Sequence, residues 1–254
     1  MSGIRALLID LEGTLYEAGR VVPGAPEAVE ELRRSGVGCL FCTNTTSRPR
    51  RQLAAELGAM GITPKPEELF TAPLAGRRYL LDRGWTRCDL MVRAAVLEDF
   101  VGIAQDDRSP SAVVMGDIGE EFTFERLNRA FHLLLDGAEL VTLARNRYYR
   151  AAEGLVLDQG PFVAALEHAS GKSATLVGKP SEHFFRAALD ALNVSPGSLA
   201  VVGDDIEADV GGGMAMGMRG ILVRTGKFRS EELARSAVRP DAVIDSVADL
   251  PRLL

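Results

Sequence analysis

Polar side chains follow several short apolar runs of the chain, at the point where each run ends. Asp10, Thr43 and Asp204 each stand just behind such a run, and Lys179 follows the apolar stretch 175–177. If these runs are parallel strands of one open sheet, their carboxyl ends meet at one edge, where ligands bind in this class of fold. The spacing therefore predicts a site that brings carboxylates, a hydroxyl group and an ammonium group together.

Such a set suits phosphoryl chemistry with a divalent cation. The carboxylates of Asp10 and Asp204 are hard oxygen ligands of the kind that Mg²⁺ prefers. A carboxylate facing a phosphoryl group can attack it and form an aspartyl-phosphate, provided that a cation and Lys179 offset the negative charge. The hydroxyl group of Thr43 and the backbone around Gly13 can hold phosphate oxygens, because glycine permits a close backbone approach.

The elements that must position these residues follow an alternating order. Strand and helix patterns alternate within the first 62 residues, and the last third of the chain repeats the alternation. This order predicts an α/β fold with a doubly wound parallel sheet over residues 1–75 and 176–254. Residues 76–175 are expected to form an inserted α+β domain.

The composition indicates which binding partners and which cellular compartment are expected. The chain has a formal net charge of −6, which argues against nucleic acid as the main partner. Three cysteines form a sparse, odd set that is typical of a reducing compartment, so a cytoplasmic protein is expected. The apolar run near the N-terminus is too short for a signal peptide or a membrane span, and no membrane partner is expected.

Four ordered motifs resemble those of a known superfamily. The pattern D-x-x-G-T-L at 10–15, the hydroxyl residue Thr43, the lysine at 179 and G-D-D-x-x-x-D at 203–209 are similar to the haloacid dehalogenase superfamily of phosphohydrolases. The long insertion resembles the C2-type cap of the NagD-like subgroup. The resemblance implies a Rossmann-like core with a cap, Mg²⁺ as cofactor and a small phosphorylated substrate. Related proteins often form dimers through the cap, so a homodimer is compatible with it.

The resemblance implies a role for each acidic residue. Asp10 would be the nucleophile and a ligand of Mg²⁺, with the main-chain carbonyl of Glu12 and the carboxylate of Asp204 as further ligands. Asp209 would belong to the metal site as well, orienting it through water or through the ligands themselves.

Other residues are implied at the phosphoryl group. Thr43 and Asn44 would contact it, with the backbone at Gly13, and Lys179 would neutralise both the nucleophile and the transferring group. Arg145 begins a basic, aromatic stretch of the insertion. It is expected either on a solvated hairpin or on a cap element that contacts the substrate.

Position 12 departs from the pattern of the superfamily. Most of its phosphatases have Asp two residues after the nucleophile as general acid and base, whereas this chain has Glu12. Either the site accommodates a longer acid, or Glu12 points away and the acid is missing. We expect a leaving group that needs little protonation, as in pyrophosphate, an acyl phosphate or a phosphoramidate such as phosphohistidine or phospholysine. The alternatives are a nucleotide or sugar phosphomonoesterase and a phosphate-binding regulatory protein with low turnover.

Two further sequence patterns resemble functional motifs but are explained more simply by packing. Cys39 and Cys42 have redox-pair spacing, but they fall in a predicted strand, where residues three apart face opposite sides. Buried packing is therefore expected. The glycines 211–213 follow no strand and lack a dinucleotide fingerprint, so they predict close helix packing.

Overall fold

The computed structural model describes residues 3–151 and 154–254. Two compact units divide the chain. The first unit comprises the chain up to Thr43, Arg50–Phe70 and Lys179–Leu254, and the inserted unit comprises Asn44–Pro49 and Thr71–Gly178. Each described helix falls short of the length or apolarity that crossing a bilayer requires.

The first unit is built on a sheet with strand order β15-β14-β13-β1-β4-β5. Strand β1 pairs in parallel with both β4 and β13, so the chain winds outward from β1 in two directions. This arrangement confirms the predicted doubly wound parallel sheet and places its switch point at β1. The strands are β1 (Ala6–Asp10), β4 (Gly38–Thr43), β5 (Leu69–Thr71), β13 (Leu199–Gly203), β14 (Arg219–Val223) and β15 (Ala242–Ile244).

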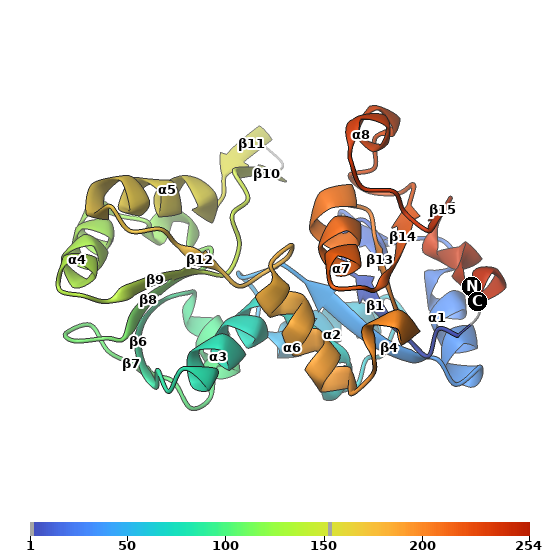
Figure 1. The fold of residues 1–254 in the computed structure, drawn as a ribbon, viewed down its shortest axis with the longest axis horizontal. Helices are drawn as coiled ribbons and strands as arrows, with labels where there is room; N and C mark the ends of the chain where they lie inside the picture. Colours follow the sequence, from blue (N-terminus) through green and yellow to red (C-terminus); the bar gives the residue numbers. More distant parts are fainter. Residues whose placement is uncertain (1–2, 152–153) are drawn as a thin grey trace. The chain divides into compact units, whose positions relative to one another are not determined.

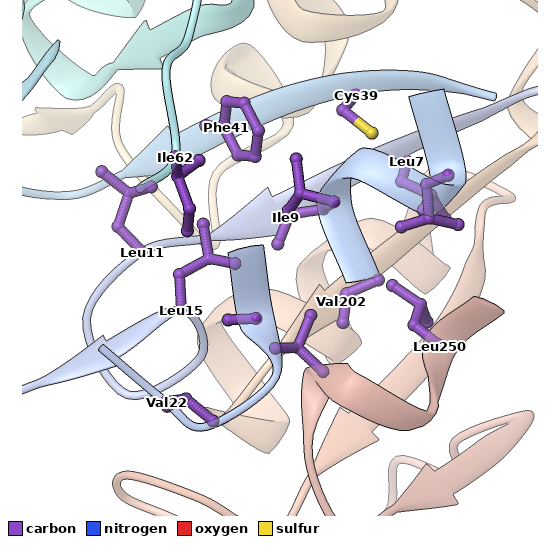
Figure 2. Packing of buried hydrophobic residues seen from close by; sticks show 14 of the residues in the cluster. Leu7, Ile9, Leu11, Leu15, Val22, Cys39, Phe41, Ile62, Val202 and Leu250 are labelled. Atoms are coloured by element: carbon purple, nitrogen blue, oxygen red, sulfur yellow. The ribbon is translucent and has the colours of Figure 1, made fainter. Parts of the chain in front are cut away.

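Helices cover this sheet (Figure 1), and buried apolar side chains pack between them and the strands. Helix α1 buries Ala25, Val29 and Leu32, which recur at helical spacing. Figure 2 shows Ile9 of β1 and Phe41 of β4 in one buried cluster. The helices of this unit are α1 (Ala25–Arg34), α2 (Arg50–Ala59), α6 (Glu182–Leu192), α7 (Gly212–Ala215), α8 (Ser230–Arg235) and α9 (Leu250–Leu253), with short 3₁₀ turns η1 (Pro66–Glu68), η4 (Pro196–Ser198) and η6 (Val247–Asp249).

A small hairpin follows β1 that the sequence does not predict. Strands β2 (Tyr16–Glu17) and β3 (Arg20–Val21) pair antiparallel. The turn between them consists of Ala18 and Gly19, with φ angles of 46° and 75°. We refer to residues 16–21 as the β2–β3 hairpin.

The segment after β13 contains two kinds of helix. It begins as a π-helix, η5 (Ile206–Gly211), which Asp205 caps by accepting hydrogen bonds from two main-chain N–H groups, and continues as α7. The glycines that follow lie against neighbouring side chains: a Cβ atom on Gly212 would overlap Phe185, and one on Gly213 would overlap Val201. This confirms close packing as the reason for the glycine run.

The inserted unit contains a second sheet, with order β12-β9-β8-β6-β7 and every pair parallel. The sequence predicts an α+β insertion, and the observed insertion has a wholly parallel sheet. Two of its strands, β7 and β12, have two residues each and are too short to be recognised in the sequence. Its elements are α3 (Ala72–Asp82), β6 (Arg87–Met91), η2 (Ala94–Phe100), β7 (Ala104–Gln105), β8 (Ala112–Met115), η3 (Gly119–Glu121), α4 (Phe124–Leu135), β9 (Glu139–Thr142), β10 (Tyr148–Ala151), β11 (Gly154–Leu157), α5 (Gln159–Ser170) and β12 (Thr175–Leu176).

A buried amide fastens the segment 44–49 to the rest of the inserted unit. Gln159 is fully buried; its Oε1 accepts a hydrogen bond from the hydroxyl of Thr46 (3.0 Å), and its Nε2 donates to the carbonyl of Ala144 (2.7 Å). The hydroxyl of Thr46 also accepts from the main-chain N–H of Asp117 (2.8 Å). Because buried polar groups are costly to leave unpaired, these bonds fix Thr46 within the unit.

The glycine packing gives a matched stability test. A Cβ atom at Gly213 would overlap Val201, so Gly213→Ala is expected to lower the free energy of unfolding by about 1–3 kcal/mol. Gly58 lies in α2, where an added Cβ atom would meet no heavy atom within 4 Å, so Gly58→Ala is expected to raise that free energy by about 0.5–1 kcal/mol. Denaturant unfolding measures both; equal effects would contradict the packing explanation.

Candidate active site

Four buried ionisable side chains meet at the carboxyl edge of the first unit's sheet. Asp10 is the last residue of β1, Asp204 follows β13, Asp209 lies in η5, and Lys179 precedes α6. Each is at most 7% exposed. The structure therefore brings together Asp10, Asp204 and Lys179, as predicted from the strand ends, with Asp209, which the resemblance implies at the same site.

The ammonium group of Lys179 lies between two carboxylates. Its Nζ donates to Oδ1 of Asp10 and to Oδ1 of Asp209, both at 2.5 Å. The other oxygen of Asp209, Oδ2, accepts from the main-chain N–H of Asp205 at 3.2 Å. Both oxygens of Asp209 thus face protein donors, so this residue is placed to hold Lys179.

Burial shifts the titration of these groups. Burial raises the pKa of Asp10 to about 8; Lys179 opposes the shift, and Asp209 and Asp204 add to it. Burial, together with Asp209, raises the pKa of Asp204 to about 6. Burial lowers the pKa of Lys179, but Asp10 and Asp209 more than offset this and hold it well above its ordinary value. The ammonium group of Lys179 therefore stays charged, and its single positive charge does not balance the carboxylates around it.

This cluster has the composition of a hard-cation site. Carboxylate oxygens of Asp10, Asp204 and Asp209 all lie within 4.8 Å of one another. When ionised, the three carboxylates carry two more charges than Lys179 can neutralise, and uncompensated buried charge is costly. An oxygen-only donor set with surplus negative charge suits a divalent cation of the Mg²⁺ type.

The loop after β14 packs around the cluster, and its residues are not among those predicted for the site. The main-chain N–H of Lys227 donates to Oδ2 of Asp204 (2.7 Å), and the hydroxyl of Thr225 donates to the carbonyl of Gly13 (2.5 Å). A Cβ atom on Gly13 or on Gly226 would overlap the Asp204 carboxylate. These residues also follow a strand of the sheet, so the strand-end rule that selects Asp10 could have found them.

Thr43 and Asn44 lie at the boundary between the units along the chain. Thr43 is the buried last residue of β4, one position beyond Cys42, which pairs in register with Asp10. Asn44 begins the inserted unit, where its Oδ1 stands 2.8 Å from the place a Cβ atom would take on Gly178. Thr43 thus lies beside the cluster, and substrate contact by Asn44 stays a prediction.

Glu12 does not join the buried cluster. Its side chain is exposed, and Oε1 accepts a hydrogen bond from the main-chain N–H of Ala18 at 2.9 Å. Of the two alternatives for this residue, the structure shows the one in which Glu12 points away from the cluster, here toward the β2–β3 hairpin.

Arg145 has a protein partner within the inserted unit. Its Nη1 and Nη2 donate to Oε1 and Oε2 of Glu167 on α5, at 3.1 and 2.6 Å. A hairpin, one of the two alternatives for this stretch, is present as the antiparallel pair β10 and β11, with Tyr148 and Tyr149 exposed. Contact of Arg145 with substrate stays a prediction.

The cysteines are packed thiols. All three are free and buried. Burial raises the pKa of Cys39 and of Cys88 to about 11, and burial raises that of Cys42, whose Sγ lies 4.0 Å from Nζ of Lys179, further still. The redox spacing of Cys39 and Cys42 thus reflects packing, as predicted.

The buried thiols predict slow alkylation. Because their pKa values lie far above 8, thiolate is scarce at pH 8 and the native protein is expected to resist iodoacetamide at Cys39, Cys42 and Cys88. Mass spectrometry should show all three labelled after unfolding in denaturant. Rapid labelling of the Cys39–Cys42 pair in the native state would contradict this assignment.

Removing the central charge should destabilise the fold. Lys179→Met leaves Asp10 and Asp209 buried without their partner, and a loss of about 3–5 kcal/mol in the free energy of unfolding is expected. The control is Arg145→Met, which breaks an ion pair whose arginine side chain is 43% exposed, with an expected loss of about 1 kcal/mol or less. Chemical unfolding in the presence of a chelator measures both. Similar losses would show that Lys179 is not the central charge of the cluster.

Comparisons with known proteins point to one family. The family described as haloacid dehalogenase-like hydrolase matches residues 7–101, and the one described as HAD-hydrolase-like matches residues 176–250. The human haloacid dehalogenase-like hydrolase domain-containing protein 2 is 44% identical over 229 residues, covering 90% of this chain and 87% of that protein. The phospholysine phosphohistidine inorganic pyrophosphate phosphatase of Rattus norvegicus is 39% identical over 260 residues, covering 100% and 95%.

A solved structure shows the same fold. The p-nitrophenyl phosphatase from Archaeoglobus fulgidus aligns with a TM-score of 0.92 and 28% identity, and the alignment covers 99% of each chain. This structural match agrees with the sequence matches, which cover nearly the whole chain. The chain belongs to the family of haloacid dehalogenase-like hydrolases.

Proposed function

We propose that this hydrolase is a phosphatase that releases inorganic phosphate through a phosphorylated Asp10. The observation that carries the proposal is the ammonium group of Lys179, held 2.5 Å from both Asp10 and Asp209 in a buried acidic cluster. The phosphatase names of similar proteins support it, as does membership of the hydrolase family.

In the first step, a carboxylate oxygen of Asp10 attacks phosphorus in line with the leaving group. The new O–P bond forms as the bond from phosphorus to the leaving group breaks, and the leaving group departs with the electron pair. In the second step, water attacks the same phosphorus atom. The bond to Asp10 breaks, which restores the carboxylate and releases phosphate.

The surrounding residues orient the nucleophile and bind the phosphoryl group. Lys179 fixes one oxygen of Asp10 and offsets negative charge on the phosphoryl oxygens, and Asp209 keeps Lys179 in place. The hydroxyl group of Thr43 and the main chain at Gly13 are the proposed phosphoryl contacts in the first unit. Asn44 and Arg145 are the proposed contacts from the inserted unit, which would select the substrate as a cap.

Asp10 and Asp204 are the proposed side-chain ligands of a Mg²⁺ ion, with the main-chain carbonyl of Glu12. When bound, the ion offsets charge on the phosphoryl oxygens and helps to orient them. Asp209 belongs to the same site, where it holds Lys179 and can reach the ion through water.

Molecules with a phosphoanhydride or a phosphoramidate bond are the favoured substrates. The relative from Rattus norvegicus that aligns with the whole chain is named for phospholysine, phosphohistidine and inorganic pyrophosphate. The alternative, a phosphomonoester such as a nucleotide or sugar phosphate, is supported by the likeness to a p-nitrophenyl phosphatase. The three free cysteines support a reducing, cytoplasmic setting. A homodimer stays a prediction.

Phosphate release from a substrate panel tests the function. Pyrophosphate, phosphohistidine, p-nitrophenyl phosphate, a nucleotide monophosphate and a sugar phosphate would be compared with Mg²⁺ and with chelator. Asp10→Asn is expected to lower release by a factor of about 10³ or more, since the nucleophile is lost. The matched control Asp190→Asn, on the exposed side of α6, should behave as the wild type.

The outcomes are separable. Release that needs Mg²⁺ and Asp10 supports the mechanism, and the ranking of substrates decides between the two classes. Release that persists in Asp10→Asn would overturn the mechanism. Mg²⁺ and phosphate binding without turnover of any substrate would favour the regulatory alternative.

A further inference from the structure

The turn of the β2–β3 hairpin contains an alanine in an unfavourable conformation. Ala18 and Gly19 have φ angles of 46° and 75°, so both occupy the left-handed region. A two-residue turn with two positive φ angles favours Asn, Asp or Gly at its first position, because a Cβ atom is strained there. An alanine at this position needs stabilisation from outside the turn.

Glu12 supplies that stabilisation. Its Oε1 accepts a hydrogen bond from the main-chain N–H of Ala18 at 2.9 Å, and a charged acceptor strengthens such a bond. The main chain next to Glu12 is tied to the same hairpin, since the N–H of Gly13 donates to the carbonyl of Tyr16 at 2.7 Å. Side chain and backbone together hold the hairpin against the segment that follows Asp10.

A second carboxylate ties the hairpin to the loop around Asp204. Oε1 of Glu17 accepts a hydrogen bond from the main-chain N–H of Gly226. Gly226 packs against the Asp204 carboxylate and against Gly13, where an added Cβ atom would overlap both. The position of the hairpin is therefore connected to the two loops that pack against the Asp204 carboxylate.

We propose that Glu12 is a positioning residue and does not act as the general acid; this rests on the proposed phosphatase function of the cluster at Asp10. Its carboxylate holds the turn at Ala18 and thereby fixes the segment 10–13. This explains the residue type, because aspartate at position 12 is one methylene shorter and cannot place its carboxylate at the same point without moving the main chain. The leaving group then departs without a proton from this side chain.

Variants at position 12 distinguish the two roles. Glu12→Gln keeps an oxygen that can accept from Ala18 but cannot donate an acidic proton, whereas Glu12→Ala removes both functions. We expect kcat/KM for aryl phosphates to fall about tenfold in Glu12→Ala and no more than about threefold in Glu12→Gln. The ratio of wild type to Glu12→Gln should stay constant with pH and with the pKa of the phenol leaving group. Loss of a general acid would instead lower both variants by about 10²-fold or more, most for the poorest leaving groups.

A rescue experiment addresses the turn itself. Ala18→Gly removes the strained Cβ atom, so it should restore much of the activity lost in Glu12→Ala and leave the Glu12 enzyme nearly unchanged. Hydrogen exchange gives a readout without turnover: the Ala18 amide should be protected in the wild type and in Glu12→Gln, and exposed in Glu12→Ala. Equal protection in all three would overturn the positioning role.

Failure of this inference is distinct from failure of the proposed function. If Asp10→Asn still releases phosphate, the function is wrong, whereas the exchange of the Ala18 amide still tests Glu12. If Asp10→Asn is inactive and Glu12→Gln is as impaired as Glu12→Ala, the function stands and the positioning role is overturned.

Discussion

The salt bridges of a single buried ammonium group organise the first unit's carboxyl edge. Lys179 lies between Asp10 and Asp209, so it joins the end of β1 to the π-helix that follows β13. Neither carboxylate could be buried at this depth without it, because an unpaired charge in such surroundings is strongly disfavoured. The π-helix, its cap at Asp205 and the close-packed glycines behind it all serve to bring Asp209 to that ammonium group.

Close backbone approach completes the arrangement. Gly13 and Gly226 let two loops lie directly against the Asp204 carboxylate, and the N–H of Lys227 donates to it. The β2–β3 hairpin is attached to the same loops through two glutamates. The site is therefore a set of main-chain segments held close around a few charges, which suits a reaction that depends on orientation and electrostatics more than on many catalytic side chains.

The sequence predicts the parts of this site that follow from strand ends. Asp10, Asp204 and Lys179 each stand behind an apolar run, and a parallel sheet brings such positions together. The loop at Thr225 obeys the same rule, but it acts largely through its main chain, so the sequence does not assign it to the site. The direction of the Glu12 side chain could not be predicted, because it depends on a hairpin whose strands have only two residues each and whose turn lacks the usual Asn-Gly pair.

The shortest strands of the inserted unit could not be predicted from the sequence either. Its helices and longer strands are evident in the sequence, whereas two-residue strands are not.

The segment 44–49 is remote in sequence from Gln159 but belongs to the inserted unit. The side-chain amide of Gln159 binds it through the hydroxyl group of Thr46. The unit is thus assembled from two separate stretches of the chain. An exchange of this unit between relatives by recombination would have to transfer both stretches together. A crossover that carried 71–178 alone would separate Gln159 from the Thr46 hydroxyl that donates to it.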